Sequence, residues 1–110
     1  MKAERPRAAR YHFIASVSVT DLDSGHQSQE STWNLSLYGC QVMPGNSVRT
    51  GTRVRIHIVH NGEAFEALGL VANVRPLMGI GILFTKVEDH HQQVLDRWLA
   101  ALRNKRLQPH

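Results

Sequence analysis

The most constraining feature of the sequence is a pair of alternating segments joined by Asn61-Gly62. Apolar and polar residues alternate in Thr52–His60, a period of two that fits a half-buried β-strand. Asn-Gly is a favoured two-residue turn of β-hairpins. Glu63–Arg75 is therefore predicted to run back beside the first strand, with a bulge at Gly69 because an interior glycine often marks one. The middle of the chain is expected to form an antiparallel hairpin.

Further stretches have strand character and are bounded by turn-forming residues. They are Tyr11–Thr20, Gln29–Asn34, Gly39–Met43 and Gly79–Phe84. Together with the central hairpin they predict a mainly β fold, a small six-stranded antiparallel β-barrel. Trp33 and Phe84 are expected to be buried. Gly79 and Gly81 lack the third glycine and following helix of a dinucleotide fingerprint, so they are interpreted as packing positions beneath the C-terminal helix.

The pattern changes after Glu88, where apolar residues recur at the spacing of a single helical stripe. The stripe consists of Val94, Leu95, Trp98, Leu99 and Leu102. Acidic residues begin this segment and basic residues follow in its later turns, which suits the helix dipole. We therefore predict a C-terminal amphipathic α-helix that covers an open side of the barrel. A helix of a partner protein is the alternative target of the stripe.

Composition limits the class of protein. Of the 110 residues, 42% are hydrophobic and 20% are charged, which is ordinary for a soluble globular domain. No apolar run approaches the roughly 20 residues that cross a bilayer, and no secretory signal is recognisable. These features predict a cytoplasmic protein without membrane insertion. The expected organisation is a flexible basic arm at 1–10, one domain at 11–103 and a tail at 104–110.

The net charge of +4 is unevenly distributed, and the first cluster of basic residues is rich in arginine. It contains Arg5, Arg7 and Arg10. Arginine presents a planar fork of donors that pairs bidentately with phosphate or with the O6/N7 edge of guanine. The arm therefore indicates an anionic ligand, although exposed charged tails are also common as simple solvated segments.

Catalytic and metal chemistry find no support in the sequence. Adjacent His90 and His91 lack the i, i+4 spacing of a helical metal site. Neither Ser36 nor Cys40 has a recognisable base, and no nucleophile-elbow sequence surrounds Ser36. Cys40 is the only cysteine, which excludes a disulfide within the chain and a thiolate-rich zinc site. We expect a binding protein rather than an enzyme, with no metal and no cofactor.

A small polar cluster, Asn34-x-Ser36-x-x-Gly39, follows the second predicted strand. In an extended backbone Asn34 and Ser36 point to the same face, and Gly39 permits a tight bend or the close approach of a ligand. The cluster therefore has the composition of a small binding surface at the end of a strand. The same residue types are common turn formers, so a purely structural turn is the alternative.

The order of these features resembles the PilZ domain, the bacterial receptor family for the second messenger cyclic di-GMP. The resemblance extends from Glu4 to about Leu102. One family motif, (D/N)xSxxG, is matched completely by Asn34, Ser36 and Gly39. The continuation after this motif, and the run 79–84 that leads into the helix, are also typical of the family.

The second family motif, RxxxR before the first strand, is not intact in this chain. If Arg10 is its second arginine, Pro6 occupies the position of the first, with Arg5 and Arg7 on either side. A proline at this position changes both the charge and the backbone freedom. Family members that lack the arginine motif often act through protein partners instead of binding the nucleotide.

The resemblance implies a PilZ-like split barrel and cyclic di-GMP as its ligand. The implied ligand-binding residues are Arg5, Arg7, Arg10, Asn34, Ser36 and Gly39. Binding would order the arginine arm over the barrel and present a new surface to an unidentified downstream protein partner.

Two alternatives to a nucleotide receptor remain open. The first is a PilZ-like interaction module that does not bind cyclic di-GMP. The second is a nucleic-acid-binding small barrel, suggested by a pI of about 9.8 and by Arg53, Arg55 and His57 on one strand face. Few aromatic residues are available to stack on bases, which makes nucleic acid the weaker alternative.

Overall fold

The computed structural model describes residues 8–43 and 48–107, which form a seven-stranded sheet and one helix. In chain order the elements are β1 (Tyr11–His12), β2 (Ser16–Asp21), β3 (Gln27–Leu35), β4 (Gly39–Met43), β5 (Arg53–His60), β6 (Glu63–Arg75), β7 (Gly79–Lys86) and α1 (Asp89–Leu107). The expected arm falls only partly within these ranges. Arg5 and Arg7 lie outside the described residues, and Arg10 lies within them.

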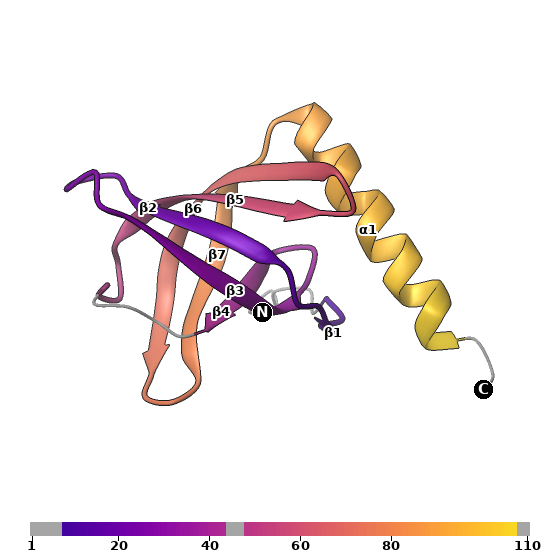
Figure 1. The fold of residues 1–110 in the computed structure, drawn as a ribbon, viewed down its shortest axis with the longest axis horizontal. Helices are drawn as coiled ribbons and strands as arrows, with labels where there is room; N and C mark the ends of the chain where they lie inside the picture. Colours follow the sequence, from indigo (N-terminus) through magenta and orange to yellow (C-terminus); the bar gives the residue numbers. More distant parts are fainter. Residues whose placement is uncertain (1–7, 44–47, 108–110) are drawn as a thin grey trace, which may run out of the picture.

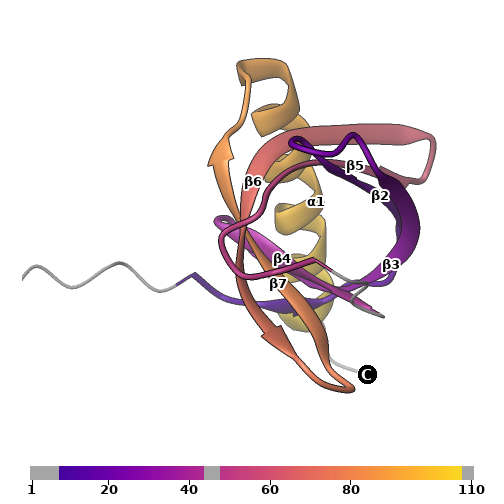
Figure 2. The ribbon, with the colours of Figure 1, turned by 90° about the vertical axis from the view of Figure 1, so that its left-hand side faces the viewer.

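The sheet closes into a barrel with one strand outside the ring (Figures 1 and 2). Hydrogen-bonded neighbours follow the order β3-β2-β5-β6-β7-β4, and β4 pairs back onto β3. All of these pairings are antiparallel, and β1 is added to β3 outside the ring. The prediction of a mainly β fold, with a six-stranded antiparallel barrel and a C-terminal helix, is confirmed.

The first predicted strand is divided into β1 and β2 by residues 13–15. Here the Thr32 side chain supplies bonds to the backbone. Its hydroxyl donates to the Phe13 carbonyl at 2.7 Å and accepts the Ala15 N–H at 2.9 Å. Thr32 is buried, so these bonds satisfy polar groups that would otherwise be costly to bury. The break allows the chain to pass from β1, next to the N-terminal arm, into the ring.

The central hairpin has the predicted form. Its last pair before the turn is His60 with Glu63, across Asn61 and Gly62. Both turn residues have positive φ, 52° and 79°, as a type I′ turn requires. The bulge expected at Gly69 is also present, because the β6–β7 register shifts between Leu68 and Gly69. Bulges bend a strand, and β6 curves from the helix side of the barrel to its far end (Figure 2).

The core is built from inward-facing residues of the strands and is covered on one side by α1. Among the largest fully buried side chains are Phe65, Leu35, Ile56, Ile58 and Leu95. Trp98 of α1 is also buried, and its ring centroid lies 6.2 Å from that of Phe65. The predicted helical stripe therefore packs on the barrel of its own chain, which confirms the first of the two expectations for it.

Hydrogen bonds also hold α1 against β6. The Glu63 carboxylate accepts hydrogen bonds from the Arg97 guanidinium and from the Trp98 indole N–H, and the hydrogen bond from Arg97 is the main cause that lowers the pKa of Glu63. Further along β6, the Glu66 backbone N–H donates to His91 Nδ1 at 3.1 Å.

Within the described ranges no helix combines the length and the apolar character needed to cross a membrane.

Two expectations about packing are wrong. Trp33 is 40% exposed rather than buried. It follows the buried Thr32, so the alternation of strand faces places its side chain on the outer side of β3. Gly79 and Gly81 do not make room for the helix. A Cβ on Gly79 would lie 2.0 Å from the Val42 carbonyl oxygen of β4, and one on Gly81 would meet the Asn73 side chain of β6. Phe84, by contrast, is half-buried and packs against the core.

Candidate functional site

The β3–β4 connection is a turn that closes around the Ser36 hydroxyl. Ser36 follows the last residue of β3 and is 8% exposed. Its Oγ accepts the backbone N–H groups of Tyr38 and Gly39 and donates to the Gly39 carbonyl, each at 3.2 Å. A hydroxyl offers one donor and two acceptor positions. The hydrogen-bonding capacity of this side chain is therefore used inside the turn.

Gly39 is required by the contact between β4 and β7. A Cβ at this position would lie 2.2 Å from the Ile82 carbonyl oxygen, a distance that atoms cannot adopt without moving the backbone. Gly39 also pairs with Leu83 in the ladder that closes the ring. The backbone that approaches this glycine closely is therefore that of a neighbouring strand, whereas the approach of a ligand stays a prediction.

Asn34 contacts a side chain of the neighbouring strand β4. It is half-buried on β3, and its Nδ2 donates to Gln41 Oε1 at 3.0 Å. Gln41 Nε2 in turn donates to the Met78 carbonyl at 2.8 Å. Because β3 ends at Leu35, Ser36 does not continue the strand alternation that would place it beside Asn34. Asn34 instead fixes the orientation of Gln41.

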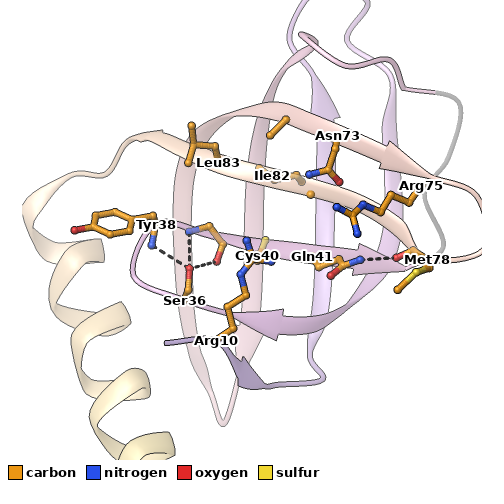
Figure 3. Close-up of a pocket in the computed structure, with 13 residues that line it drawn as sticks. Arg10, Ser36, Tyr38, Cys40, Gln41, Asn73, Arg75, Met78, Ile82 and Leu83 are labelled. Carbon is orange, nitrogen blue, oxygen red and sulfur yellow. Dashed lines mark hydrogen bonds between the residues drawn. The ribbon is translucent and has the colours of Figure 1, made fainter. Parts of the chain in front are cut away.

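A hollow of about 190 Å³ lies over β4, β6 and β7, next to this turn (Figure 3). Its polar lining comes from Arg10, Ser36, Gln41, Asn73 and Arg75. Figure 3 shows the Arg10 and Arg75 side chains reaching toward it from opposite sides of β4. Of the predicted site residues that the structure describes, Arg10, Ser36 and Gly39 line the hollow, and Asn34 contacts it through Gln41.

Sequence reasoning missed the residues that β6 and its turn contribute. Asn73, Arg75 and Met78 all line the hollow. Asn73 and Arg75 stand two positions apart near the end of β6, so they share a face of the strand. That spacing was visible in the sequence. Their position opposite Arg10 was not, because it depends on the register shift between Val71 and Asn73 and on the space left by Gly81.

The charge of the hollow is positive. Arg10 and Arg75 contribute two guanidinium groups, and no carboxylate is found among the described residues that line it. Gln41 and Asn73 add amide groups, which can both donate and accept hydrogen bonds. The arrangement is therefore suited to an anion that also carries directional hydrogen-bonding groups.

Cys40 and the described His, Asp and Glu side chains are the residues to consider for nucleophilic and metal chemistry. The Cys40 side chain is buried, and burial raises the pKa of its thiol to about 12. A reactive cysteine needs accessible thiolate, so this one acts as a core residue. Within the described part of the chain, no group of three or more His, Cys, Asp or Glu residues is placed to hold a metal ion.

Comparison with known families identifies the class to which this fold and site belong. The family model described as PilZ domain matches residues 2–101. This match includes most of the 110 residues, and the chain therefore belongs to the PilZ domain family. No curated protein sequence matches the chain significantly.

Solved structures with the same fold include two that are themselves described as PilZ domains. The PilZ domain of CeSA from a cellulose-synthesizing bacterium superimposes with a TM-score of 0.71 at 18% identity, over 86% of this chain and 98% of that one. The PilZ domain of YcgR from Escherichia coli, solved with c-di-GMP, gives a TM-score of 0.68 at 15% identity, over 93% and 94%. At these identities the likeness shows a shared fold.

A third similar structure belongs to a longer protein. The inhibitor of motility MotI/DgrA of Bacillus subtilis gives a TM-score of 0.76 at 15% identity over 96% of this chain. The match covers 55% of the MotI/DgrA chain, so the present chain corresponds to about half of that protein.

Proposed function

We propose that this chain is a receptor for cyclic di-GMP, which binds across the hollow between Arg10 and Arg75. The observation that carries the proposal is the convergence of these two guanidinium groups, from distant parts of the sequence, on one hollow lined by amide side chains. Cyclic di-GMP has two phosphates and two guanines. A guanidinium can pair bidentately with phosphate or with the guanine O6/N7 edge, and can stack on the base.

Family and fold support the same ligand. The chain belongs to the PilZ family, and the PilZ domain of YcgR, which shares its fold, was solved with c-di-GMP. A role as a receptor or adaptor, rather than as an enzyme, also agrees with the buried, protonated Cys40 thiol.

The residues of the site have different roles in this proposal. Arg10 and Arg75 bind the anionic groups, and Asn73 and Gln41 supply directional hydrogen bonds. Asn34 is a positioning residue, because its described contact is with Gln41. Ser36 and Gly39 form the turn that makes one wall of the hollow. The family motif thus contributes to binding mainly by shaping the site.

The N-terminal arm completes the site in this proposal. The hollow measures about 190 Å³, which is smaller than the roughly 300–1,000 Å³ of a typical ligand pocket. Part of the nucleotide must therefore lie outside it. We infer that Arg5 and Arg7 cover this part, so that binding orders the arm over the barrel and creates a surface for a downstream partner.

Isothermal titration with cyclic di-GMP tests the proposal. The wild type is expected to bind at micromolar nucleotide, and Arg10→Ala and Arg75→Ala should each weaken binding by about 1.5–3 kcal/mol, the value of a hydrogen bond to a charged group. Arg53→Ala is the matched control, because Arg53 is exposed, pairs with Asp23 and does not line the hollow. Absence of heat with the wild type, or an equal loss in the control, contradicts the proposal.

The altered arginine motif gives a second test. Pro6→Arg restores RxxxR together with Arg10 and should tighten nucleotide binding. If the wild type does not bind and Pro6→Arg does, the natural chain is an interaction module that has lost the nucleotide. If neither binds, the family resemblance predicts the fold without the function.

An interaction module that does not bind nucleotide is the second candidate. One observation favours it: the fold alone accounts for Ser36 and Gly39, so their presence does not require a ligand.

Nucleic-acid binding is less well supported. Of the three residues proposed on β5, Arg53 pairs with Asp23, which reduces the positive charge available to a phosphate backbone, and His57 contacts Glu66.

A further inference from the structure

The turn between β6 and β7 has an unusual residue at its third position. The Met78 N–H donates to the Arg75 carbonyl at 3.0 Å, which closes a four-residue turn with Pro76 second and Leu77 third. Leu77 has a φ of 67°. Proline second and a positive φ third are the pattern of a type II turn, whose third residue is normally glycine or asparagine. Leucine is strained in this conformation.

The fold does not use the Leu77 side chain, which is 97% exposed. One neighbour in the same turn, Met78, is also large, apolar and exposed. We call Leu77 and Met78 the apolar tip. It lies at the end of the β6–β7 hairpin, which projects from the barrel on the side away from the first turn of α1 (Figures 1 and 2). Leu77 combines a strained backbone with an exposed apolar side chain. Such a residue indicates a role in contacting another molecule rather than in folding.

The apolar tip is held in place by contacts with β4. Gln41 Nε2 donates to the Met78 carbonyl at 2.8 Å. At the other end of the turn, Gly79 lies so close to β4 that a Cβ would be 2.0 Å from the Val42 carbonyl oxygen. A fixed apolar protrusion loses little conformational entropy on docking, which favours affinity.

We propose that the apolar tip docks into an apolar pocket of a partner protein whose rim carries carboxylates. The charge of the rim follows from Arg75, which begins the same turn, and from Arg10, which lines the hollow beside it. A membrane is the less suitable partner. Two side chains bury fewer apolar carbons than a single myristoyl chain, which by itself anchors a protein only marginally.

Docking itself does not depend on the proposed nucleotide binding, but its regulation does. Arg75 borders both the apolar tip and the hollow. An anionic nucleotide in the hollow would neutralise the charge that attracts the carboxylate rim. Cyclic di-GMP is therefore expected to weaken docking of this partner, which differs from the downstream partner that would recognise the ordered arm. This expectation rests on the proposed function, and it is measured separately from docking in the absence of nucleotide.

The experiment begins with a photo-cross-linking amino acid placed at Leu77 of the full chain in its native cells. The same group at Val59, an exposed apolar residue on β5, is the control. The protein cross-linked only from position 77 is then purified and titrated without nucleotide. Leu77→Asn should weaken its binding at least tenfold without lowering the Tm, because asparagine tolerates positive φ. Val59→Thr should leave binding unchanged.

Charge reversal tests the chemistry of the rim. Arg75→Glu should weaken docking at least tenfold, and a carboxylate-to-lysine change near the cross-linked pocket of the partner should restore it.

The proposal is overturned if cross-linking from position 77 yields no protein, or if positions 77 and 59 yield the same protein. It is also overturned if Leu77→Asn binds the purified partner as tightly as the wild type. Sedimentation of the wild type, but not of Leu77→Asn, with phosphatidylglycerol vesicles would overturn it in favour of a membrane. If docking is confirmed and cyclic di-GMP gives no heat with the chain alone, only the proposed function fails.

Discussion

The two turns that border the hollow differ in how closely they follow the local rules of turn formation. In the β3–β4 turn, Ser36 and Gly39 satisfy the backbone and allow β4 to approach β7. In the β6–β7 turn, Leu77 occupies a position that favours glycine and exposes its side chain. The first turn is explained by folding, and the second is not. A sequence motif can therefore mark a family because it builds the fold, whereas residues outside the motif carry functional information.

The largest effect is expected at Gly39. Gly39→Ala places a methyl group against the Ile82 carbonyl, and because the obstructing atom belongs to the backbone, the clash cannot be relieved by a side-chain rotation. The free energy of unfolding should fall by about 3 kcal/mol, the upper part of the range for overpacking. Urea denaturation measures this change. Gly25→Ala is the comparison, since a Cβ added there would have no atom within 4 Å. It should cost only the roughly 1–2 kcal/mol of placing alanine at a positive φ of 78°. A loss in Gly25→Ala as large as that in Gly39→Ala would contradict the packing explanation.

Ser36→Ala should have the next largest effect. The change removes the acceptor for two backbone N–H groups and the donor to the Gly39 carbonyl. Leaving such groups unpaired costs about 1–3 kcal/mol of stability. Thermal unfolding measures the Tm of Ser36→Ala. The control is Ser24→Ala, which removes an exposed side-chain acceptor in another turn. If Ser36→Ala keeps its stability and loses only nucleotide affinity, Ser36 is a ligand contact and its hydroxyl does not stabilise the turn.

Asn34→Ala should affect binding more than folding. Because Asn34 holds Gln41 by a hydrogen bond at 3.0 Å, its loss frees a side chain that lines the hollow and should weaken nucleotide binding by about 1 kcal/mol. A double-mutant cycle with Gln41→Ala separates the two roles that Asn34 could have. Coupling between the two changes supports positioning through Gln41, whereas additive losses indicate that Asn34 contacts the nucleotide itself.

The smallest expected effect concerns Leu77. Leu77→Asn relieves the strain of positive φ and removes an exposed apolar side chain, so the free energy of unfolding should rise by about 0.5 kcal/mol or stay the same. Denaturant titration checks it, with Leu77→Ala as the variant that removes the side chain but keeps most of the strain. A clear loss of stability in Leu77→Asn would show that the leucine is a folding residue.

The fold could be predicted from the sequence because its signals are local. Alternation in Thr52–His60, the Asn61-Gly62 turn and the apolar stripe of α1 each specify an element without knowledge of its neighbours. The break in the first strand was missed because it depends on the Thr32 side chain, which reaches residues 13 and 15 from β3. Trp33 was expected in the core, but it follows the buried Thr32 and therefore lies on the outer face of β3.

The site was less predictable because it is defined by contacts between distant residues. The motif led to Ser36 and Gly39, which line the hollow, but not to Asn73 or Arg75, which meet Arg10 only through the register of β4, β6 and β7. The spacing that placed Asn34 and Ser36 on a common face assumed that the strand continued, and β3 ends between them. The roles of Arg5 and Arg7 remain predictions, since both lie outside the described residues.

The proposed occupant of the hollow between Arg10 and Arg75 is cyclic di-GMP. Two-dimensional amide NMR during a titration with the nucleotide tests it most directly. We expect saturable shifts of the backbone signals of Gly39, Asn73 and Gly81, which border the hollow, and little change at Arg55 and His57 on β5. Shifts confined to the β5 face, or no shifts at millimolar nucleotide, would contradict it.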